Sequence, residues 1–525
     1  MEPDEVIDVL IIGAGPTGTT LAIDLARRGL QVRILDKAPK AFDGSRAKGI
    51  QPRSLEVFAD LGALDDILAA GSLYPKLGLH VGPFNVPWRM FRTVEPTASV
   101  PYPNTWLVPQ YSVDGALHAQ LGRHGHTAEF GHELLDFMQD AETVTATVLT
   151  ANGQEQITAR YLVGADGGSS AVRKTLGIHF GGSTDEQDRI LIIDAITTGL
   201  SRDRWHFWPR LSGNFIGACP LPHTELFQWM IRFAPGEDPP QDLGAIVQRI
   251  HAHTGNRRIS LRDIQWKSVF RPNIRLAEHY RDGRVFLAGD AAHVHTPAGA
   301  QGLNTGVQDA YNLGWKLGQV LAGADKSLLD SYEAERQPIA ANVLGLSTKK
   351  YQGIGTLDRS VIKRGKDEQQ LALTYCEGPL ARSGDRTDTL RTGDRAPDAE
   401  LDSTDGRELR LHQTLCGPHF TAIAYGTRAA DDLNRLAWPS TGAPLKRITI
   451  DAPGQTAGHA LSDGARTFRE AYGVSGDALF LVRPDGYLAH IATRDFLTTT
   501  RLAAQSLTPK AWSGHIHESG GNLPN

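Results

Sequence analysis

Cysteine is scarce in this chain, and neither sign of charge is in strong excess. The 525 residues include only three cysteines, Cys219, Cys376 and Cys416, and no CxxC pair. A disulfide framework, a zinc knuckle and a dithiol redox site are therefore disfavoured. Lys and Arg number 54 against 59 Asp and Glu, which gives a formal net charge of −5. Without a basic excess, sequence-independent binding of nucleic acid is not expected.

Long apolar segments are also absent. The N-terminus reads MEPDEV, which is acidic where a secretion signal carries positive charge. No later stretch reaches the ~20 apolar residues that a membrane-spanning helix needs. The sequence therefore predicts a soluble, cytoplasmic protein without a membrane span. Its length suggests about two to four domains, and the 40% hydrophobic and 22% charged residues are typical of globular proteins.

What the chain does contain is a glycine-rich turn near its start. Residues 6–12 (VIDVLII) have the apolar, β-branched character of a buried strand, and residues 13–18 (GAGPTG) form a GxGxxG turn. Apolar residues at helical spacing follow over 21–26, and a second strand, 32–35, closes on Asp36. Such a turn suits a dinucleotide pyrophosphate at a helix N-terminus, and Asp36 suits ribose hydroxyls. A carboxylate there disfavours NADP at this site, but FAD and NAD both fit.

Two further blocks have the same strand-then-turn character. Residues 161–173 (YLVGADGGSSAVR) run from a strand into a turn that contains Asp166. Residues 283–306 (GRVFLAGDAAHVHTPAGAQGLNTG) run from a buried strand past Asp290 into a glycine- and proline-rich loop that opens a helix. Each aspartate could equally be a helix N-cap, which is a common role for Asp after a strand.

Together and in this order, the three blocks resemble those of the FAD-dependent aromatic hydroxylases. These are single-component flavoprotein monooxygenases of the p-hydroxybenzoate and phenol hydroxylase type. The resemblance covers about residues 5–345. It implies an α/β fold in which a Rossmann-like FAD-binding domain carries an inserted antiparallel β-sheet substrate domain and a C-terminal thioredoxin-like domain. The expected divisions are 1–177 with 276–385 for FAD, 178–275 for substrate and 390–525 for the thioredoxin-like domain.

The resemblance also implies which residues bind FAD. They belong to the three blocks, to the end of the second strand and to two intervening segments: Gly13, Ala14, Gly15, Pro16, Thr17, Gly18, Asp36, Lys37, Arg46, Gln110, Asp166, Asp290, Pro297, Ala300, Gly302, Leu303 and Asn304.

Individual roles follow from the same resemblance. The GxGxxG turn would hold the pyrophosphate, and Asp36, where relatives often have Glu, would bind the adenosine ribose. Arg46 would lie near the flavin or its phosphates, while Gln110 and Asp290 would lie near the ribityl chain. Asp166 is linked in the family to both FAD and NAD(P)H.

The third block would run along the flavin ring. The backbone amides of Leu303 and Asn304 would face the pyrimidine edge of the flavin, where a helix N-terminus stabilises negative charge. Ala300 stands where relatives often have glycine, so its methyl group could crowd the flavin face.

The middle of the chain changes character. Short apolar or aromatic runs over 190–197, 204–210, 214–221 and 226–233 predict antiparallel strands, which the resemblance places as a cap over the flavin. Large aromatic side chains suit a pocket for a flat substrate, although ordinary sheet packing is the stronger explanation for any single one of them. These aromatics are Trp205, Phe207, Trp208, Phe227 and Trp229, and His206 and Tyr102 are candidates for orienting a phenol.

A separate C-terminal part is expected. The polar stretch 383–401 has the composition of a linker, and residues 478–492 predict a hairpin with a turn at Arg483-Pro484-Asp485-Gly486. These segments are similar to the thioredoxin-like tail of phenol hydroxylase-type proteins. Because no CxxC is present, we expect a structural or dimer-contacting role, with a homodimer as a further expectation.

The activity that the resemblance implies is hydroxylation of a phenolic or polycyclic aromatic substrate. NAD(P)H would reduce FAD, and O2 would form a flavin C4a-hydroperoxide that oxygenates the ring. With no second GxGxxG, the nicotinamide would bind transiently; the family favours NADPH, and NADH stays open. No residue is assigned as a catalytic acid or base. His293 and His295 form an HxH pair, but no further ligand set accompanies it, so a metal is not expected.

Alternatives to this activity stay open at the level of sequence. The same scaffold could perform Baeyer–Villiger oxidation or tailor a polyketide or antibiotic. An NAD-dependent dehydrogenase that uses the first GxGxxG for nicotinamide is a further alternative, which the second and third blocks disfavour.

Overall fold

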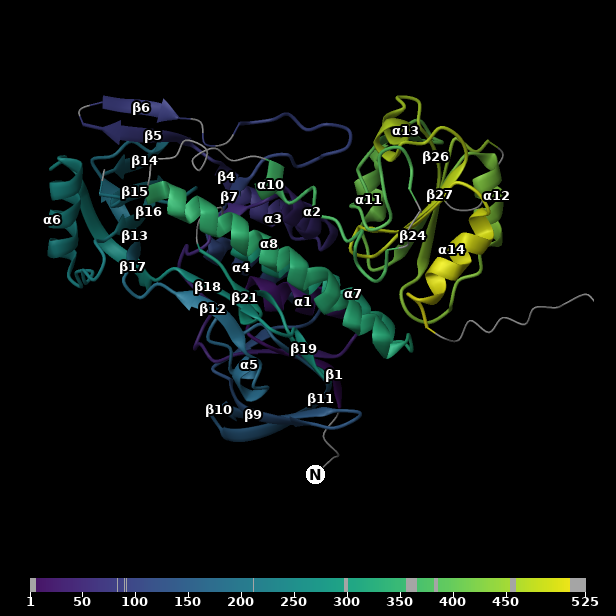
Figure 1. Ribbon diagram of the computed structural model, residues 1–525, viewed down its shortest axis with the longest axis horizontal. Helices are drawn as coiled ribbons and strands as arrows, with labels where there is room; N and C mark the ends of the chain where they lie inside the picture. The colour runs from purple at the N-terminus through teal and green to yellow at the C-terminus, as the bar shows by residue number, and fades with distance from the viewer. Residues whose placement is uncertain are drawn as a thin grey trace, which may run out of the picture.

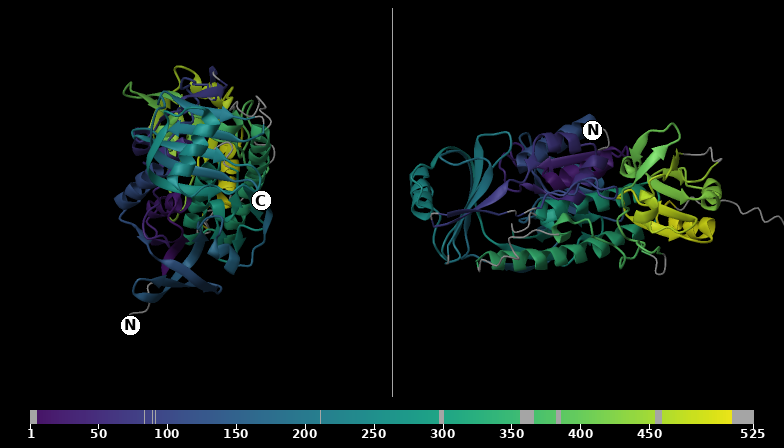
Figure 2. Two further views of the ribbon diagram at one scale, coloured as in Figure 1. Left: turned by 90° about the vertical axis from the view of Figure 1, so that its left-hand side faces the viewer. Right: turned by 90° about the horizontal axis from the view of Figure 1, so that it is seen from above.

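Three large sheets follow one another along the molecule. The computed structural model describes residues 6–82, 84–88, 90, 92–210, 212–296, 301–355, 366–381, 386–453 and 459–509. Figures 1 and 2 show one sheet with a helix on its outer side at one end, a central α/β region, and a third, C-terminal region at the other end. The predicted mixed α/β fold is confirmed. Within the described residues, no helix is both long enough and apolar enough to cross a membrane.

The central sheet has the Rossmann-like arrangement that the first motif predicts. Its path runs β19-β20-β11-β1-β2-β8, and β20, β11, β1, β2 and β8 are parallel. An antiparallel extension, β9 and β10, continues from β11. The strands are β1 (Ile7–Ile12), β2 (Val32–Asp36), β8 (Ala128–Phe130), β9 (Glu133–Gln139), β10 (Val144–Thr150), β11 (Gly153–Gly164), β19 (Arg281–Asp282) and β20 (Val285–Leu287).

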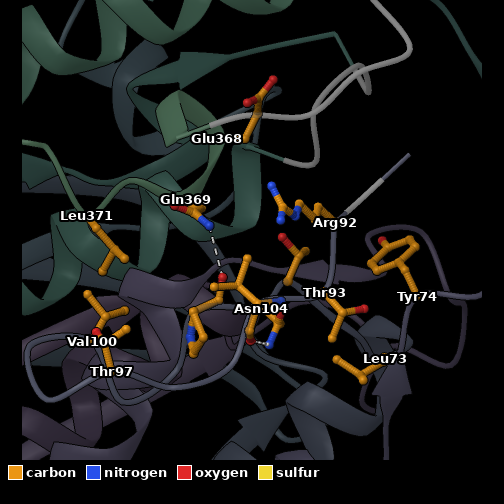
Figure 3. Close-up of a pocket in the computed structure, with 13 residues that line it drawn as sticks. Leu73, Tyr74, Arg92, Thr93, Thr97, Val100, Asn104, Glu368, Gln369 and Leu371 are labelled. Atoms are coloured by element: carbon orange, nitrogen blue, oxygen red, sulfur yellow. Dashed lines mark hydrogen bonds between the residues drawn. The ribbon is translucent and has the colours of Figure 1, made fainter. Parts of the chain in front are cut away.

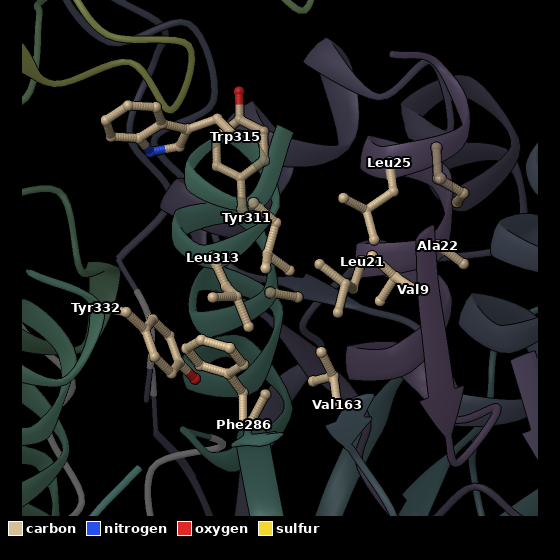
Figure 4. Close-up of a cluster of buried hydrophobic side chains, with 14 of the residues drawn as sticks. Val9, Leu21, Ala22, Leu25, Val163, Phe286, Tyr311, Leu313, Trp315 and Tyr332 are labelled. Carbon is tan, nitrogen blue, oxygen red and sulfur yellow. The ribbon is translucent and has the colours of Figure 1, made fainter. Parts of the chain in front are cut away.

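Helices α1 and α7 pack against this sheet and against each other. Apolar residues of β1, β11 and β20 lie in one buried cluster with side chains of both helices, as Figure 4 shows for Val9, Leu21, Val163, Phe286 and Leu313. The helices of this region are α1 (Pro16–Ala26), α2 (Pro52–Asp60), α3 (Leu64–Ala69), α4 (Gln110–Arg123), α5 (Ala171–Thr175), α7 (Gly302–Leu321), α8 (Asp330–Gly355) and α10 (Lys366–Gln369), with 3-10 turns η1 (Gly289–Ala291) and η2 (Lys326–Leu329).

The second large sheet contains the strands predicted for the middle of the chain. Its order is β17-β13-β16-β15-β14-β5-β6. Two of its strands come from earlier in the chain, and β5 pairs with β14 in parallel, whereas the other pairings are antiparallel. The elements are β5 (Lys76–Val81), β6 (Phe84–Trp88), β13 (Ile190–Thr198), β14 (Arg204–Pro209), β15 (Phe215–Pro220), β16 (Leu226–Arg232), β17 (Ser260–Phe270) and the helix α6 (Leu243–Thr254).

Two small sheets connect these parts. One has the order β3-β7-β4 and the other β12-β18-β21. The strands are β3 (Gly49–Ile50), β4 (Ser72–Leu73), β7 (Trp106–Leu107), β12 (Phe180–Thr184), β18 (Asn273–Ala277) and β21 (His293–Val294).

The C-terminal sheet includes the predicted hairpin, which is β27 and β28. Its order is β23-β22-β26-β25-β24-β27-β28. The elements are β22 (Glu400–Ser403), β23 (Glu408–Arg410), β24 (Phe420–Tyr425), β25 (Leu445–Ile450), β26 (His459–Ser462), β27 (Ala478–Val482), β28 (Leu488–Ala492), α11 (Leu411–Leu415), α12 (Thr427–Arg435), α13 (Thr467–Tyr472) and α14 (Phe496–Gln505).

The interpretation of residues 383–401 as a linker is wrong for its described part. The Gly393 N–H donates to the Leu488 carbonyl (2.8 Å), and the Ala396 N–H donates to the Gly486 carbonyl (2.9 Å). This polar stretch therefore packs on the hairpin, because the hairpin supplies partners for its backbone donors.

Candidate functional site

The three glycine-containing motifs meet at one edge of the central sheet. Gly13 follows β1, Asp36 ends β2, Asp166 follows β11, and Asp290 lies just past β20. These are the carboxyl ends of neighbouring parallel strands, where open α/β sheets bind their ligands. The structure thus brings together residues that are far apart in the sequence.

Close backbone contacts hold the motifs against one another. A Cβ on Gly13 would lie 2.3 Å from the Ala165 carbonyl oxygen, so the first turn has no room for a side chain there. A Cβ on Gly289 or Gly306 would lie 2.6 or 2.3 Å from the Thr17 Oγ1. The three motifs therefore form one packed unit.

Gly15 is different, because a Cβ there would meet nothing within 4 Å. It is the N-cap of α1, and its φ of −79° and ψ of −175° are accessible to any residue. The open space lies at a helix N-terminus, where unpaired N–H groups and the helix dipole favour an anion.

Asp36 is oriented by two backbone donors. The Ala14 N–H donates to Oδ2 (2.9 Å) and the Ala38 N–H donates to Oδ1 (2.8 Å). Each oxygen of a carboxylate can accept further hydrogen bonds, so ribose hydroxyls can still bind. Lys37, the other residue predicted at this position, is exposed.

A second carboxyl, which none of the sequence motifs contains, lies close by. Asp114 is buried on α4, one helical turn after Gln110. Burial raises the pKa of Asp114 to about 7, and the charge of Asp36 acts in the same direction. The i, i+4 spacing from Gln110 is the signal that could have found it.

Three of the predicted flavin-proximal residues lie together. The Arg46 guanidinium is 3.9 Å from the Asp290 carboxylate, and the two side chains are 61% and 39% exposed. The Gln110 Oε1 accepts the Ala47 N–H (3.5 Å), which links α4 to the residue after Arg46. A cation, an anion and an amide therefore border the same space.

The start of α7 also borders this edge of the sheet. Gly302 and Leu303 are half-buried. The Asn304 side chain donates to the Gly49 carbonyl and accepts the Gln51 N–H, both at 2.8 Å, so it anchors β3. The Asn304 side chain is thus used within the protein, and the backbone N–H groups of this first turn are the ones that the helix dipole makes suitable for negative charge.

Pro297 and Ala300, the remaining residues predicted for the third motif, lie outside the described residues.

Asp166 accepts hydrogen bonds from the first turn of α5, although the N-cap of this helix is Ser170. Its Oδ2 accepts the Ala171 and Val172 N–H groups at the start of α5 (2.7 and 3.2 Å). Its Oδ1 is buried without a hydrogen-bond partner. These contacts therefore use one oxygen and leave the other without a partner among the described residues.

The second large sheet has two unlike faces. One face packs against α6, and it includes Trp208, Phe227 and Trp229, so ordinary sheet packing accounts for these three aromatics. A second apolar cluster includes half-buried side chains, which we call the half-buried apolar cluster of the cap: Phe207, Met230, Trp266 and Phe270.

The structure places His206, a candidate for orienting a phenol, beside Trp208 on the face of the cap that packs against α6. Alternating side chains of a strand point to opposite faces, and His206 stacks with Trp208, 5.5 Å between ring centroids. Its Nε2 is 2.8 Å from the Ser201 carbonyl oxygen and its Nδ1 is 2.9 Å from His80 Nε2. Tyr102 packs edge-on against His412 of the C-terminal part, 6.4 Å between centroids.

The segment Phe42–Lys48 is held against the second large sheet by hydrogen bonds and close packing. The Ser45 N–H and hydroxyl both donate to the Asp194 carboxylate of β13 (2.6 and 2.5 Å). The Gln228 amide of β16 donates to the same hydroxyl (2.5 Å). A Cβ on Gly44 would lie 2.4 Å from the Trp266 ring. The segment that carries Arg46 is therefore held by three strands of the cap.

A pocket of about 310 Å³ lies beside β4. Figure 3 shows Arg92, Tyr74, Glu368 and Gln369 around it. The Gln369 Nε2 donates to the Pro103 carbonyl (2.9 Å). The Tyr74 hydroxyl donates to the Lys48 carbonyl (3.2 Å), so the pocket adjoins the Phe42–Lys48 segment.

The HxH pair is built into the protein core. His293 Nε2 is 2.6 Å from the Asp309 carboxylate, and burial lowers the pKa of His295 to about 3. Among the residues that the structure describes, no three His, Cys, Asp or Glu side chains gather in a way that could hold a metal ion.

Comparisons with known proteins agree with this geometry. Residues 6–347 match the family model described as an FAD binding domain. A flavin-dependent monooxygenase of Mycobacteroides abscessus is 41% identical over 91% of this chain and 96% of its own. The 6-methylpretetramide 4-monooxygenase of Streptomyces rimosus is 32% identical over 98% and 96%. The structure of aklavinone-11 hydroxylase with FAD and aklavinone superposes with a TM-score of 0.79 at 27% identity, covering 97% and 99% of the two chains.

The chain belongs to the FAD binding domain family. It is an enzyme, a flavin-dependent monooxygenase related to the aromatic hydroxylases. The dehydrogenase and Baeyer–Villiger alternatives are not favoured, since the relatives named above are monooxygenases and a hydroxylase.

The residues present fit FAD. The space over Gly15 at the start of α1 admits a pyrophosphate, and a Cβ on Gly302 would meet only the Asp290 Oδ1, at 3.8 Å. Between these two positions, the polar groups combine carboxylates that accept hydrogen bonds with an arginine and backbone amides that donate them. Such a set matches the ribose, phosphate and ring edges of a flavin dinucleotide.

Proposed function

We propose that this enzyme hydroxylates a phenolic ring of a fused-ring aromatic polyketide, using NAD(P)H and O2. The observation that carries the proposal is the position of the half-buried apolar cluster of the cap, whose strands also hold the segment that carries Arg46. A flat aromatic substrate suits such a wall. The 6-methylpretetramide and aklavinone relatives support this substrate class.

The FAD would be held along the edge of the central sheet. The first turn would bind the pyrophosphate with backbone amides of residues 13–18, and Asp36 and Lys37 would lie at the adenosine ribose. Arg46, Gln110 and Asp290 would contact the ribityl and flavin end, and Asp166 would contribute its free Oδ1. Residues 297–304 would follow the flavin ring.

When bound, FAD supplies the redox chemistry that activates O2. The first turn of α7 would stabilise negative charge at the flavin through its backbone amides. The cap would exclude water and place the ring of the substrate, because water in such a site diverts the reaction. In the overall reaction, the substrate C–H, O2, NAD(P)H and one proton give the phenol, water and NAD(P)+.

The remaining expectations belong to the same proposal. NADPH is the favoured reductant, and the enzyme would work in the cytoplasm, where NADPH is regenerated. The chain would divide into an FAD-binding part (1–177 and 276–385), a substrate cap (178–275) and a thioredoxin-like part (390–525), with homodimer contacts through the last.

The test begins with the purified protein under anaerobic conditions. We expect a yellow protein whose flavin band bleaches with NADPH faster than with NADH. Anhydrotetracycline and aklavinone, each supplied with ¹⁸O2, should then accelerate NADPH oxidation and yield a product with one ¹⁸O on an intact ring.

Nuclear magnetic resonance of that product separates a phenol from a ring-expanded lactone, which has the same mass. A lactone would contradict hydroxylation while leaving the monooxygenase class intact. Flavin that is reduced normally but transfers oxygen to none of a panel of fused-ring phenols would contradict the substrate class.

A further inference from the structure

Lys48 is a buried cation at the junction between the Phe42–Lys48 segment and the cap. Its side chain reaches across to strands β14 and β16. The Nζ donates to the Gln228 Oε1, lies 3.8 Å from the Met230 sulfur, and sits 4.7 Å from the centroid of the Trp205 ring. The residue is only 8% exposed.

An ammonium group has three donors, and here one amide oxygen and the weakly accepting Met230 sulfur receive two of them. Among the described residues, no carboxylate lies within ion-pair distance of Nζ. Asp194, the nearest acid in electrostatic terms, is engaged by Ser45. Cys219 is the other titratable group nearby, and burial raises the pKa of its thiol to about 11, so it stays uncharged.

Burial of an unpaired charge lowers the stability of the folded protein. A buried lysine without a counter-ion therefore indicates a functional role for its charge. In the described part of the chain, the Lys48 ammonium makes none of the hydrogen bonds that hold the neighbouring backbone in place. The Lys48 carbonyl, which any residue would provide, accepts the Val108 N–H (3.0 Å) and the Tyr74 hydroxyl (3.2 Å).

The position of Nζ is informative as well. Lys48 follows Arg46 by two residues, and Arg46 faces Asp290 in the candidate flavin site. Met230, which contacts Nζ, also belongs to the half-buried apolar cluster of the cap. The charge therefore lies between the flavin side and the wall proposed for the substrate ring.

We propose that the Lys48 ammonium binds the ionised phenol oxygen of the substrate and so selects for hydroxylated aromatic rings. This inference rests on the proposed function, because it names a contact within that substrate site. The phenolate would take the donor that Gln228 and Met230 leave unused and would displace the weak contact with the Met230 sulfur, and the Trp205 ring would cover the pair. An anionic oxygen on the ring also raises electron density at the carbon to be oxygenated.

The test uses 1,2-dihydroxyanthraquinone, a fused-ring phenol whose ionised form absorbs beyond the oxidised flavin band. The dye is titrated with pH while bound to the FAD-loaded enzyme and to Lys48→Met, Lys48→Gln and Lys48→Arg. Lys326→Met, which removes an exposed lysine beside Glu142, is the matched control.

We expect the wild type to increase the ionisation constant of the bound phenol about tenfold to a hundredfold, as an adjacent cation does. Lys48→Met and Lys48→Gln should lose this increase and bind the dye about tenfold to a hundredfold more weakly at pH 8. Lys48→Arg should keep most of the increase in the ionisation constant, and Lys326→Met should keep all of it.

The outcomes separate the two proposals. If Lys48→Met, with full FAD content and an unchanged melting temperature, still ionises the dye as the wild type does, the role of Lys48 is overturned and the proposed function stands. If both neutral variants lose FAD, Lys48 is structural and the inference is likewise overturned. If the wild type binds neither this dye nor anhydrotetracycline, the proposed substrate class fails and the inference falls with it.

Discussion

At the scale of single residues, the glycines of the first turn have different roles. Gly18 has no room for a side chain, because a Cβ there would lie 1.9 Å from the Gly13 carbonyl oxygen. Gly15 has open space above it. Packing therefore explains the need for Gly18, whereas the open space at Gly15 fits the proposed approach of a ligand.

This difference predicts opposite phenotypes for two substitutions. Gly15→Val should fold with a melting temperature close to that of the wild-type apoprotein, but bind FAD at least about tenfold more weakly, a change of ~1.4 kcal/mol. Gly18→Ala should destabilise the apoprotein by about 1–3 kcal/mol or more through overpacking. Flavin fluorescence titration and thermal unfolding of the apoproteins measure the two effects. Equal destabilisation by both substitutions would contradict the assignment.

Asp114 predicts a pH dependence of stability. Its pKa is about 7 in the folded protein against an ordinary value of 3.8, so between these pH values only the folded state holds the proton. The resulting stabilisation is complete below about pH 4 and is lost as pH rises through 7, up to about 4 kcal/mol.

Asp114→Asn should therefore leave the apoprotein unchanged at pH 4 and make it more stable than the wild type at pH 8. Chemical unfolding of both apoproteins across this range measures the difference. A wild type and variant that differ equally at both pH values would show that the carboxyl does not titrate near 7.

At the scale of elements, Asp309 of α7 connects the 3-10 turn η1 to the rest of the site. Its Oδ2 accepts the Gly289 N–H (3.1 Å), and the same oxygen lies 2.6 Å from His293 Nε2. Its Oδ1 accepts from the Arg336 guanidinium (2.7 Å), and both side chains are fully buried. Because η1 carries Asp290, this cluster positions a residue proposed to bind the flavin.

Asp309→Asn should leave the buried Arg336 charge without a counter-ion and destabilise the protein by roughly 3–5 kcal/mol. It should also lower the FAD content of the purified enzyme. Asp330→Asn is the control, since the Asp330 side chain is 70% exposed and pairs with an exposed partner contribute ~1 kcal/mol or less. Thermal unfolding and absorbance at the flavin band give both readouts; an Asp309 variant that matches the control would refute the coupling.

Elements near the motifs could be predicted from sequence. The strand before Gly13, the helix after it and the hairpin over 478–492 all lie where local patterns place them, because each depends on contiguous residues. The addition of β5 and β6 to the cap sheet could not be predicted, since β5 pairs with β14 across a long stretch of chain.

At the scale of the whole molecule, the turn of the C-terminal hairpin is buried against α7 and α8. The Arg483 guanidinium donates to the Glu335 carboxylate (2.7 and 3.0 Å). Glu335 also pairs with Lys316 (2.8 Å), and the Trp315 Nε1 donates to the Asp485 carboxylate (3.1 Å). One buried apolar cluster includes residues of α7 and of β24 and β27, so the two parts share a core.

This shared core predicts a single cooperative unfolding transition for the wild type in calorimetry. Arg483→Met should leave buried carboxylates short of a partner, lower stability by roughly 3–5 kcal/mol and separate the transition of the C-terminal part. Arg428→Met, which removes an exposed ion pair with Asp477, should change little. A variant at position 483 that melts like the wild type would show that the interface does not depend on this network.

The sequence by itself determined the fold class and the type of cofactor. Each motif is a short strand–turn–helix unit whose glycines and aspartates act locally, so contiguous residues carry the signal. Tertiary structure alone decided which face of each cap strand packs against α6. Successive side chains of a strand point to opposite faces, but this alternation does not say which of the two faces another element covers. It also decided the surroundings of Lys48 and Asp114, since burial and charge there come from strands and helices that are distant in the chain.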